Sequence, residues 1–224
     1  MTKIDETLIE GWTNALEEGL SRIEADDDTL EWFSQSVKYD EDKFNEAINQ
    51  NQTKLFIQET IKEKQLEDIK VIEKHLLGKS YKTIQCVASQ GTKYQLKLPK
   101  SLQLYVIQGS DCFLNSLLIA SNMKGDMVYG LMESEFNTIA LHMWNFLNPA
   151  YFDYTSEIQK DGVLGKRYFI LKRFKPYEFF YAWRHMGEDE DKETFHLRLM
   201  NTVAKNKKRA QLEFNQWLST RFGL

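Results

Sequence analysis

The chain has 224 residues, of which 42% are hydrophobic, 13% aromatic and 28% charged, with three prolines and eleven glycines. This composition is typical of a folded globular protein and excludes a disordered or low-complexity chain. The amino terminus has no apolar signal-peptide core, and the longest apolar stretch, near residues 113–120, is too short to cross a bilayer. We therefore expect a soluble cytoplasmic protein without membrane association, in which Cys86 and Cys112 stay reduced.

The net charge of −4 hides an uneven distribution along the chain. Residues 1–77 carry 19 acidic and 9 basic side chains, whereas residues 78–224 carry 14 acidic and 20 basic ones. Such a split either draws the two halves together within the fold or directs an acidic surface towards a partner. Internal attraction is the simpler explanation, because oppositely charged layers can pack together without serving any function.

The first 77 residues are predicted to be helical. Apolar residues recur every three or four positions at the start, at Ile4, Leu8, Trp12, Leu16, Leu20 and Ile23. Asp28 and Glu31 have capping-box spacing and predict the start of a second, short helix. Residues 41–77 are predicted to be helical with a solvated bend at Lys62–Gln65, ending before Gly78, since glycine tolerates the left-handed conformation that ends helices.

After Gly78 the hydrophobic period changes to that of strands. The segment Thr92–Leu98 alternates polar and apolar residues, which indicates a half-buried strand. Tyr81–Ala88 and Leu102–Gln108 flank it across short turns, so the pattern predicts a three-stranded meander.

Residues 112–133 fit two structures. One is a helix over Cys112–Asn122 capped by Asp111. The other is a hairpin in which Leu117–Ser121 pairs with Met127–Met132. The Asn-Met-Lys-Gly-Asp tract between these two segments has the composition of a hairpin loop and favours the hairpin.

The remaining residues predict a helix, a strand and two more helices. Ser134 caps the first helix, which carries Phe136, Ile139, Ala140, Met143, Phe146 and Leu147 on one face and stops at Asn148-Pro149. Lys166–Phe174 is predicted to be a strand, and Pro176 to begin the next helix. A long final helix then continues almost to Gly223.

Together these elements predict an α+β fold, with amino-terminal helices packed on a mainly antiparallel meander sheet and closed by carboxy-terminal helices. We expect a single domain over residues 1–224. Within it, 1–77 is a helical subregion, 78–175 is the sheet with one inserted helix, and 176–224 is a second helical subregion.

One tract has catalytic character: Gly109 to Ser116 runs Gly-Ser-Asp-Cys-Phe-Leu-Asn-Ser. Locally it resembles the cysteine box of ubiquitin-specific proteases, in which a Gly-Asn-Thr-Cys-Phe-x-Asn-Ser run starts a helix. The resemblance implies a hydrolase with Cys112 as its nucleophile, because a helix amino terminus makes a thiol more reactive. The chain departs from that pattern at Ser110 and Asp111, and an acid beside the thiol opposes thiolate formation. No histidine segment of the family's kind follows, so the sequence favours a buried structural cysteine.

The histidines and the basic residues offer little further chemistry. His75, His142, His185 and His196 never stand at metal-ligand spacing, so we expect no metal and no cofactor. His142 is predicted to lie within a helix. A basic patch near the carboxy terminus has the residue types that contact nucleic-acid phosphates. It consists of Lys205, Lys207, Lys208 and Arg209. Because the whole chain is acidic, with a pI of about 5.7, nucleic acid is not the expected partner.

In the absence of a catalytic constellation, the sequence favours a non-catalytic protein-binding role. One form is an immunity or inhibitor-type protein whose acidic helices neutralise a basic protein. The expected partner-binding residues are Asp26, Asp27, Asp28, Glu31, Asp40, Glu41 and Asp42. The alternative is a cysteine hydrolase centred on Cys112, and the second alternative is a nucleic-acid-binding protein that uses the carboxy-terminal basic patch.

Overall fold

The computed structural model describes residues 1–37, 39–93, 95, 111–159, 164–184, 190–204 and 206–223. Its helices are α1 (Glu6–Ser21), α2 (Asp27–Ser36), α3 (Glu41–Asn49), α4 (Thr53–His75), α6 (Cys112–Met123), α7 (Tyr154–Gln159), α8 (Pro176–Trp183), α9 (Lys192–Asn201) and α10 (Lys207–Phe222). Its strands are β1 (Thr2–Lys3), β2 (Ser80–Ile84), β3 (Asp126–Glu133), β4 (Ile139–Leu147), β5 (Ala150–Phe152) and β6 (Arg167–Phe174).

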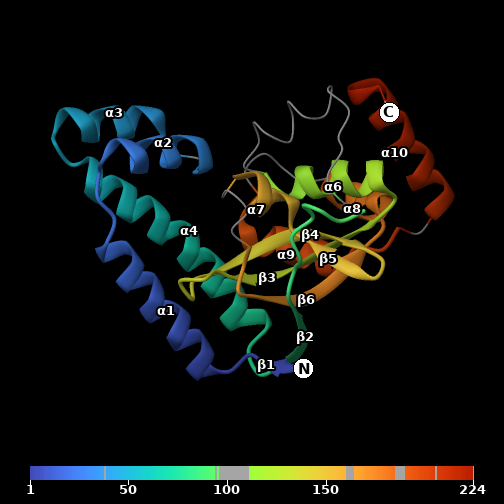
Figure 1. The fold of residues 1–224 in the computed structure, drawn as a ribbon, viewed down its shortest axis with the longest axis horizontal. Helices are drawn as coiled ribbons and strands as arrows, with labels where there is room; N and C mark the ends of the chain where they lie inside the picture. Colours follow the sequence, from blue (N-terminus) through green and yellow to red (C-terminus); the bar gives the residue numbers. More distant parts are fainter. Residues whose placement is uncertain are drawn as a thin grey trace.

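The strands form one antiparallel sheet with the order β1-β2-β6-β3-β4-β5 (Figure 1). The consecutive strands β3, β4 and β5 are the meander part of this sheet. Helices from both ends of the chain pack against it, so the α+β class and its general arrangement are confirmed. Among the described residues, no helix has the length and apolar character needed to cross a membrane.

The two faces of the sheet bury different residues. Tyr129 and Met143 belong to the core under α6 and α8, and Leu131, on the same face, packs against α1 and α4. Trp144 and Tyr168 lie on the opposite face in a smaller core. Each large apolar side chain buried in this way stabilises the fold by roughly 1.5–3 kcal/mol. The central strands are thus covered on both faces. This coverage determines where on the sheet the functional side chains described below can lie.

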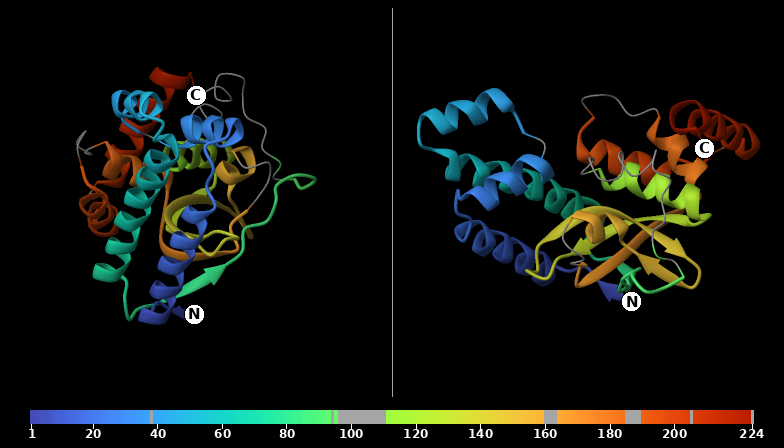
Figure 2. Two further views of the ribbon diagram at one scale, coloured as in Figure 1. Left: turned by 90° about the vertical axis from the view of Figure 1, so that its left-hand side faces the viewer. Right: turned by 45° about the horizontal axis from the view of Figure 1, so that its top comes forward.

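The amino-terminal helices extend away from the sheet. Helices α1 and α4 run side by side, and α2 and α3 lie at their far end, at a distance from the strands (Figures 1 and 2). We call residues 26–49, which contain α2 and α3, the acidic arm. The arm is held to α4 by an aromatic cluster, in which the rings of Phe33, Tyr39 and Phe44 contact one another and Phe56 of α4.

Several predicted elements are confirmed with small shifts. Helix α1 buries Trp12 and Leu16 as its apolar stripe predicts, and Gly78 has a φ of +79° after α4. Helix α2 begins two residues earlier than expected, because its cap is Asp26 and not Asp28. The Asp26 carboxylate accepts from the Thr29 N–H. The segment 41–77 breaks at 50–52, between α3 and α4, and not at Lys62–Gln65.

The hairpin predicted over residues 117–132 is wrong, and the helical alternative is correct. Cys112–Met123 is helix α6, capped by the Asp111 carboxylate. The Asn-Met-Lys-Gly-Asp tract does form a turn, but it joins this helix to β3. Lys124 adopts a left-handed conformation (φ 55°) that ends the helix.

The helix predicted after Ser134 is also wrong, because Ile139–Leu147 is strand β4. This strand lies between β3 and β5 and is buried on both faces, so its apolar residues do not alternate with polar ones. A continuous apolar run of this kind has no period that separates a buried strand from a helix.

Two other predictions are corrected in part. The predicted strand at Tyr81–Ala88 is present as β2, but Thr92, Lys93 and Gln95 are in turns or irregular structure. The rest of Thr92–Leu98 and the whole of Leu102–Gln108 lie outside the described residues. The long final helix is two helices, α9 and α10, separated at 202–206.

Candidate active site

Cys112 is the first residue of α6. The Asp111 carboxylate caps the helix by accepting hydrogen bonds from the N–H groups of Phe113 (2.9 Å) and Leu114 (3.1 Å). This acid is therefore directed at the helix backbone. The partly buried Cys112 thiol lies close enough to His142 to help raise the pKa of its imidazole. A helix amino terminus and a neighbouring imidazolium both stabilise a thiolate.

His142 lies on β4 and comes from a different part of the chain. Its Nε2 atom is 2.9 Å from Oδ2 of Asp153. Because Asp153 occupies Nε2, Nδ1 is the ring nitrogen left for the Cys112 thiol. The indole of Trp144 is stacked near the imidazole, with ring centroids 6.3 Å apart. Gly130, opposite His142 on β3, makes room for this indole, since a Cβ atom there would lie 2.6 Å from it.

Asp153 lies between β5 and α7 and is completely buried. Besides the His142 contact, its carboxylate accepts hydrogen bonds from the Tyr168 hydroxyl (2.9 Å), the Ser156 hydroxyl (2.7 Å) and the Ser156 N–H (3.1 Å). The Tyr168 oxygen in turn accepts from the N–H of Gly165 at 2.8 Å. These donors fix the carboxylate, which fixes the orientation of the imidazole.

The ionisable groups of this site shift one another's pKa values. Burial alone would lower the pKa of His142, but the charges of Asp153 and Cys112, and hydrogen bonds with both, raise it to about 10. Burial would raise the pKa of Asp153, yet His142 and Ser156 hold it below its ordinary value. At neutral pH, His142 is therefore an imidazolium that donates from Nε2–H to Asp153, which leaves Nδ1–H directed to other neighbours.

The second cysteine has the opposite environment. Cys86 is buried in the same small core as Trp144 and Tyr168, and burial raises the pKa of its thiol, assisted by the negative charge of Asp153. A protonated, inaccessible thiol is a poor nucleophile. The two cysteines therefore differ in environment: Cys112 is partly buried at a helix amino terminus, whereas Cys86 is buried in a core.

The acidic residues predicted to bind a partner are gathered in the arm. All seven are exposed: Asp26, Asp27, Asp28, Glu31, Asp40, Glu41 and Asp42. Asp26 caps α2 and Asp40 caps α3, and Asp40 also lies 3.8 Å from the Lys43 ammonium. None of these residues is near Cys112.

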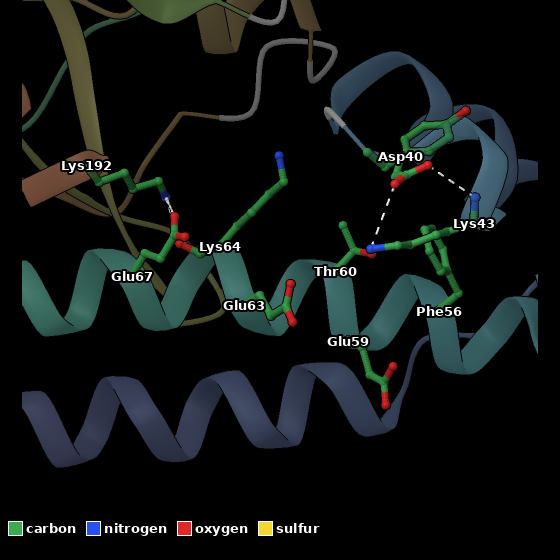
Figure 3. A pocket seen from close by; sticks show the side chains of 10 residues that line it. Asp40, Lys43, Phe56, Glu59, Thr60, Glu63, Lys64, Glu67 and Lys192 are labelled. Carbon is green, nitrogen blue, oxygen red and sulfur yellow. Dashed lines mark hydrogen bonds and ion pairs between the residues drawn. The ribbon is translucent and has the colours of Figure 1, made fainter. Parts of the chain in front are cut away.

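A cavity of about 860 Å³ lies between α3, α4 and the start of α9 (Figure 3). Its lining mixes both signs of charge, and Lys192 is paired with Glu67 at 3.8 Å. Its lining is drawn from α3, α4, α9 and the residues just before α3, so it contains no residue of the Cys112–His142–Asp153 group. The volume of this cavity therefore does not indicate where the candidate catalytic residues lie.

The basic residues are largely engaged within the fold. In the carboxy-terminal patch, Lys207, Lys208 and Arg209 are exposed, but Arg209 pairs with Glu213 at 2.7 Å; Lys205 lies outside the described residues. On β6, Arg167 pairs with Glu133, and Arg173 with Asp126.

Sequence reasoning located Cys112 but missed its partners. His142 was assigned to a helix, and Asp153 was not singled out at all. Asp153 did carry a local signal, because Ser156 follows it at the spacing of a helix cap. The cysteine box followed by a histidine on a strand was the combination that could have revealed the site.

No family model, curated protein or solved structure matches this chain. Among the described residues, no cluster of three or more His, Cys, Asp or Glu side chains has the geometry to hold a metal ion. The case for function therefore rests on the geometry of the site.

Proposed function

We propose that the protein is a cysteine hydrolase with Cys112 as nucleophile, His142 as general acid and base, and Asp153 as the residue that orients His142. The observation that supports this is the chain of contacts from a thiol at a helix amino terminus, through an imidazole, to a buried carboxylate 2.9 Å beyond it. Nucleophile, base and orienting group in this relation recur on unrelated folds and are recognised by geometry, not by sequence position.

The reaction follows from these roles. The Cys112 thiolate attacks the carbonyl carbon of an amide, ester or thioester, and the carbonyl electron pair moves to oxygen. Collapse of this intermediate breaks the bond to the leaving group, which takes a proton from Nδ1 of His142. Water then attacks the carbonyl carbon of the acyl-enzyme thioester and gives a proton to His142; the C–S bond breaks, its electron pair returns to the Cys112 sulfur as thiolate, and the carboxylic acid product leaves.

The amino terminus of α6 also supplies an electrostatic contribution. The Asp111 carboxylate accepts from the second and third residues of the helix, Phe113 and Leu114, and not from the Cys112 N–H. An N–H in this position is suited to bind the oxyanion formed during attack on the neighbouring sulfur.

Thiol labelling combined with hydrolysis of an activated ester tests the proposal. Iodoacetamide at pH 6 should modify Cys112 at least tenfold faster than Cys86, and 4-nitrophenyl acetate should be hydrolysed with a burst of acyl-enzyme. Cys112→Ala should abolish both signals, and Cys86→Ala should preserve both. Equal labelling of the two cysteines, or full hydrolysis by Cys112→Ala, would contradict the proposal.

A second proposal concerns the acidic arm. We propose that it binds a basic surface of a protein partner, which for a hydrolase would be a substrate or regulator. The eight exposed carboxylates of the arm and the separation of α2 and α3 from the sheet support this (Figure 1). Such a charged surface increases the rate of association more than the affinity.

A further inference from the structure

Two hydrogen bonds connect the helix that carries Cys112 with the strand that carries His142. The Ser116 hydroxyl on α6 donates to the main-chain carbonyl of Met143 on β4 at 2.9 Å. In the opposite direction, the Asn145 side-chain amide on β4 donates to the main-chain carbonyl of Ser116, also at 2.9 Å. Both side chains are buried, with an exposed fraction of 1% each.

The position of these bonds relates them directly to the proposed reactive pair. Ser116 lies one helical turn after Cys112, and therefore on the same side of α6. Met143 directly follows His142 along β4. Any sliding of α6 along β4 that changes the separation of thiol and imidazole must therefore lengthen or break both bonds. Hydrogen bonds weaken steeply beyond about 3.2 Å or when misaligned.

The apolar contacts around these bonds do not provide the same control. Leu117, Met143 and Leu147 pack in the surrounding core. Apolar burial is non-directional, so it holds the helix on the sheet without determining its exact register. A pair of opposed hydrogen bonds does determine that register.

Burying the polar side chains of Ser116 and Asn145 also costs free energy of folding. The Asn145 Oδ1 atom is buried and has no hydrogen-bond partner among the described residues. A leucine, which has nearly the same size, would pack in this core without leaving a polar atom unpaired. The amide is therefore better explained by the positioning of α6 on β4 than by stabilisation of the fold.

We propose that Ser116 and Asn145 are positioning residues, which set the separation and orientation of the Cys112 thiol and the His142 imidazole. This inference rests on the proposed cysteine hydrolase. Neither residue touches the sulfur or the imidazole; both act through the main chain of the elements that carry them.

The test measures the rate of Cys112 alkylation by iodoacetamide from pH 4 to pH 9, in a Cys86→Ala background. Ser116→Ala and Asn145→Leu should each lower the rate at pH 5–6 about tenfold, because a small misplacement of reacting groups has effects of this size or larger. The rate at pH 9 should change little, because the thiol is then ionised without help from His142. The pH profile should move towards that of His142→Ala. The double variant should add little to either single change, because both bonds hold the same contact.

Ser121→Ala is the matched control. The Ser121 hydroxyl lies on the same helix but donates to the carbonyl of Leu117 at 2.6 Å, within α6, and does not reach β4. This variant should keep the wild-type pH profile. Melting temperatures of all variants show whether the fold is intact, and each variant removes one bond from a different element, so either one that folds decides the question.

The two possible failures can be told apart. Wild-type pH profiles in Ser116→Ala and Asn145→Leu, even with lower melting temperatures, would overturn the positioning role and leave the hydrolase intact. A wild-type protein with the same profile as His142→Ala would overturn the reactive pair, and the positioning role with it.

Discussion

In the acidic arm eight carboxylates face solvent, whereas beside α6 one histidine and one aspartate are buried and bonded to each other, and the aspartate has further hydrogen-bond partners. The arm contains many exposed charged groups. The candidate active site contains few, but they are held in place by hydrogen bonds: Asp153 accepts from three different side chains. Both regions contain ionisable groups, but only the second holds them in fixed mutual geometry.

The difference has a physical basis. Exposed charges are screened by water, and an individual exposed ion pair contributes about 0–1 kcal/mol. Buried charges interact in a medium of low effective dielectric constant, so each partner changes the protonation state of the others. The number of acidic residues along the chain therefore points to the arm, although it is at His142 and Asp153 that buried partners shift each other's pKa values.

Replacing His142 by alanine should have the largest effect. Hydrolysis of 4-nitrophenyl acetate should fall roughly 10²–10⁴-fold, because the thiol loses its general base and its counter-charge. His196→Ala is the matched control, since His196 is also buried but lies on α9. It should keep the rate within a few-fold. Equal losses in the two variants would show that any buried histidine supports the activity only through the fold.

Asp153→Asn should reduce hydrolysis by about 10²-fold, because an amide misorients the imidazole. It should also lower the free energy of unfolding by about 1–3 kcal/mol, because buried donors lose their carboxylate acceptor. Urea denaturation and steady-state rates measure the two effects separately.

Asp126→Asn provides the comparison for Asp153→Asn. Asp126 is also buried, but it pairs with Arg173 and Lys175 at the start of β3. Its replacement should destabilise the fold and leave hydrolysis unchanged. An Asp126→Asn variant as inactive as Asp153→Asn would remove the special role of Asp153.

Acid should weaken the packing of α9. The Nδ1 atom of His196 is 3.0 Å from the Tyr129 hydroxyl, and its ring stacks on that of His75. Burial, followed by the positive charges of His75 and Lys79, lowers the pKa of His196 to about 4. The unfolded chain binds this proton near pH 6.5 and the folded chain does not, so stability falls between pH 6.5 and about 4 and is unaffected above that range.

The loss from His196 should be on the order of 2–3 kcal/mol. Urea unfolding at pH 7.0, 5.5 and 4.5 measures it, and His196→Gln, which cannot be protonated, should flatten this part of the pH dependence. An equally steep decline in His196→Gln would assign the effect to other groups.

Charge reversal in the arm should have the smallest effect on stability. Asp27→Lys with Asp28→Lys, leaving the cap Asp26 in place, should change the free energy of unfolding by less than about 1 kcal/mol. If the arm binds a basic partner, the association rate of a lysine-rich test peptide should fall about tenfold at low salt, and 0.5 M salt should remove the difference. A clearly lower melting temperature with an unchanged rate would instead mean that the acidic residues serve the fold.

Sequence patterns succeeded where one element's own residues determine its structure. The apolar stripe of α1, the proline at the start of α8 and the strand ending at Phe174 follow from local spacing and local geometry. The cap at Asp111 was also visible, but it competed with the turn composition of residues 122–126. Residues 122–126 do form a turn, but it joins helix α6 to strand β3 and does not join two strands.

Sequence patterns alone predict the helical amino-terminal part and the strand at β6, whereas over residues 112–133 they favour a hairpin instead of the capped helix that the structure contains. Tertiary structure decided that residues 139–147 are a strand, because burial on both faces removes the alternation that identifies strands. It also decided the site, because Cys112 on α6, His142 on β4 and Asp153 between β5 and α7 meet only when α6 packs beside β4. Local spacing reports the preferences of one segment. Cys112 stands 30 residues before His142, and Asp153 stands 11 residues after it, so the three side chains become neighbours only through the packing of the whole fold.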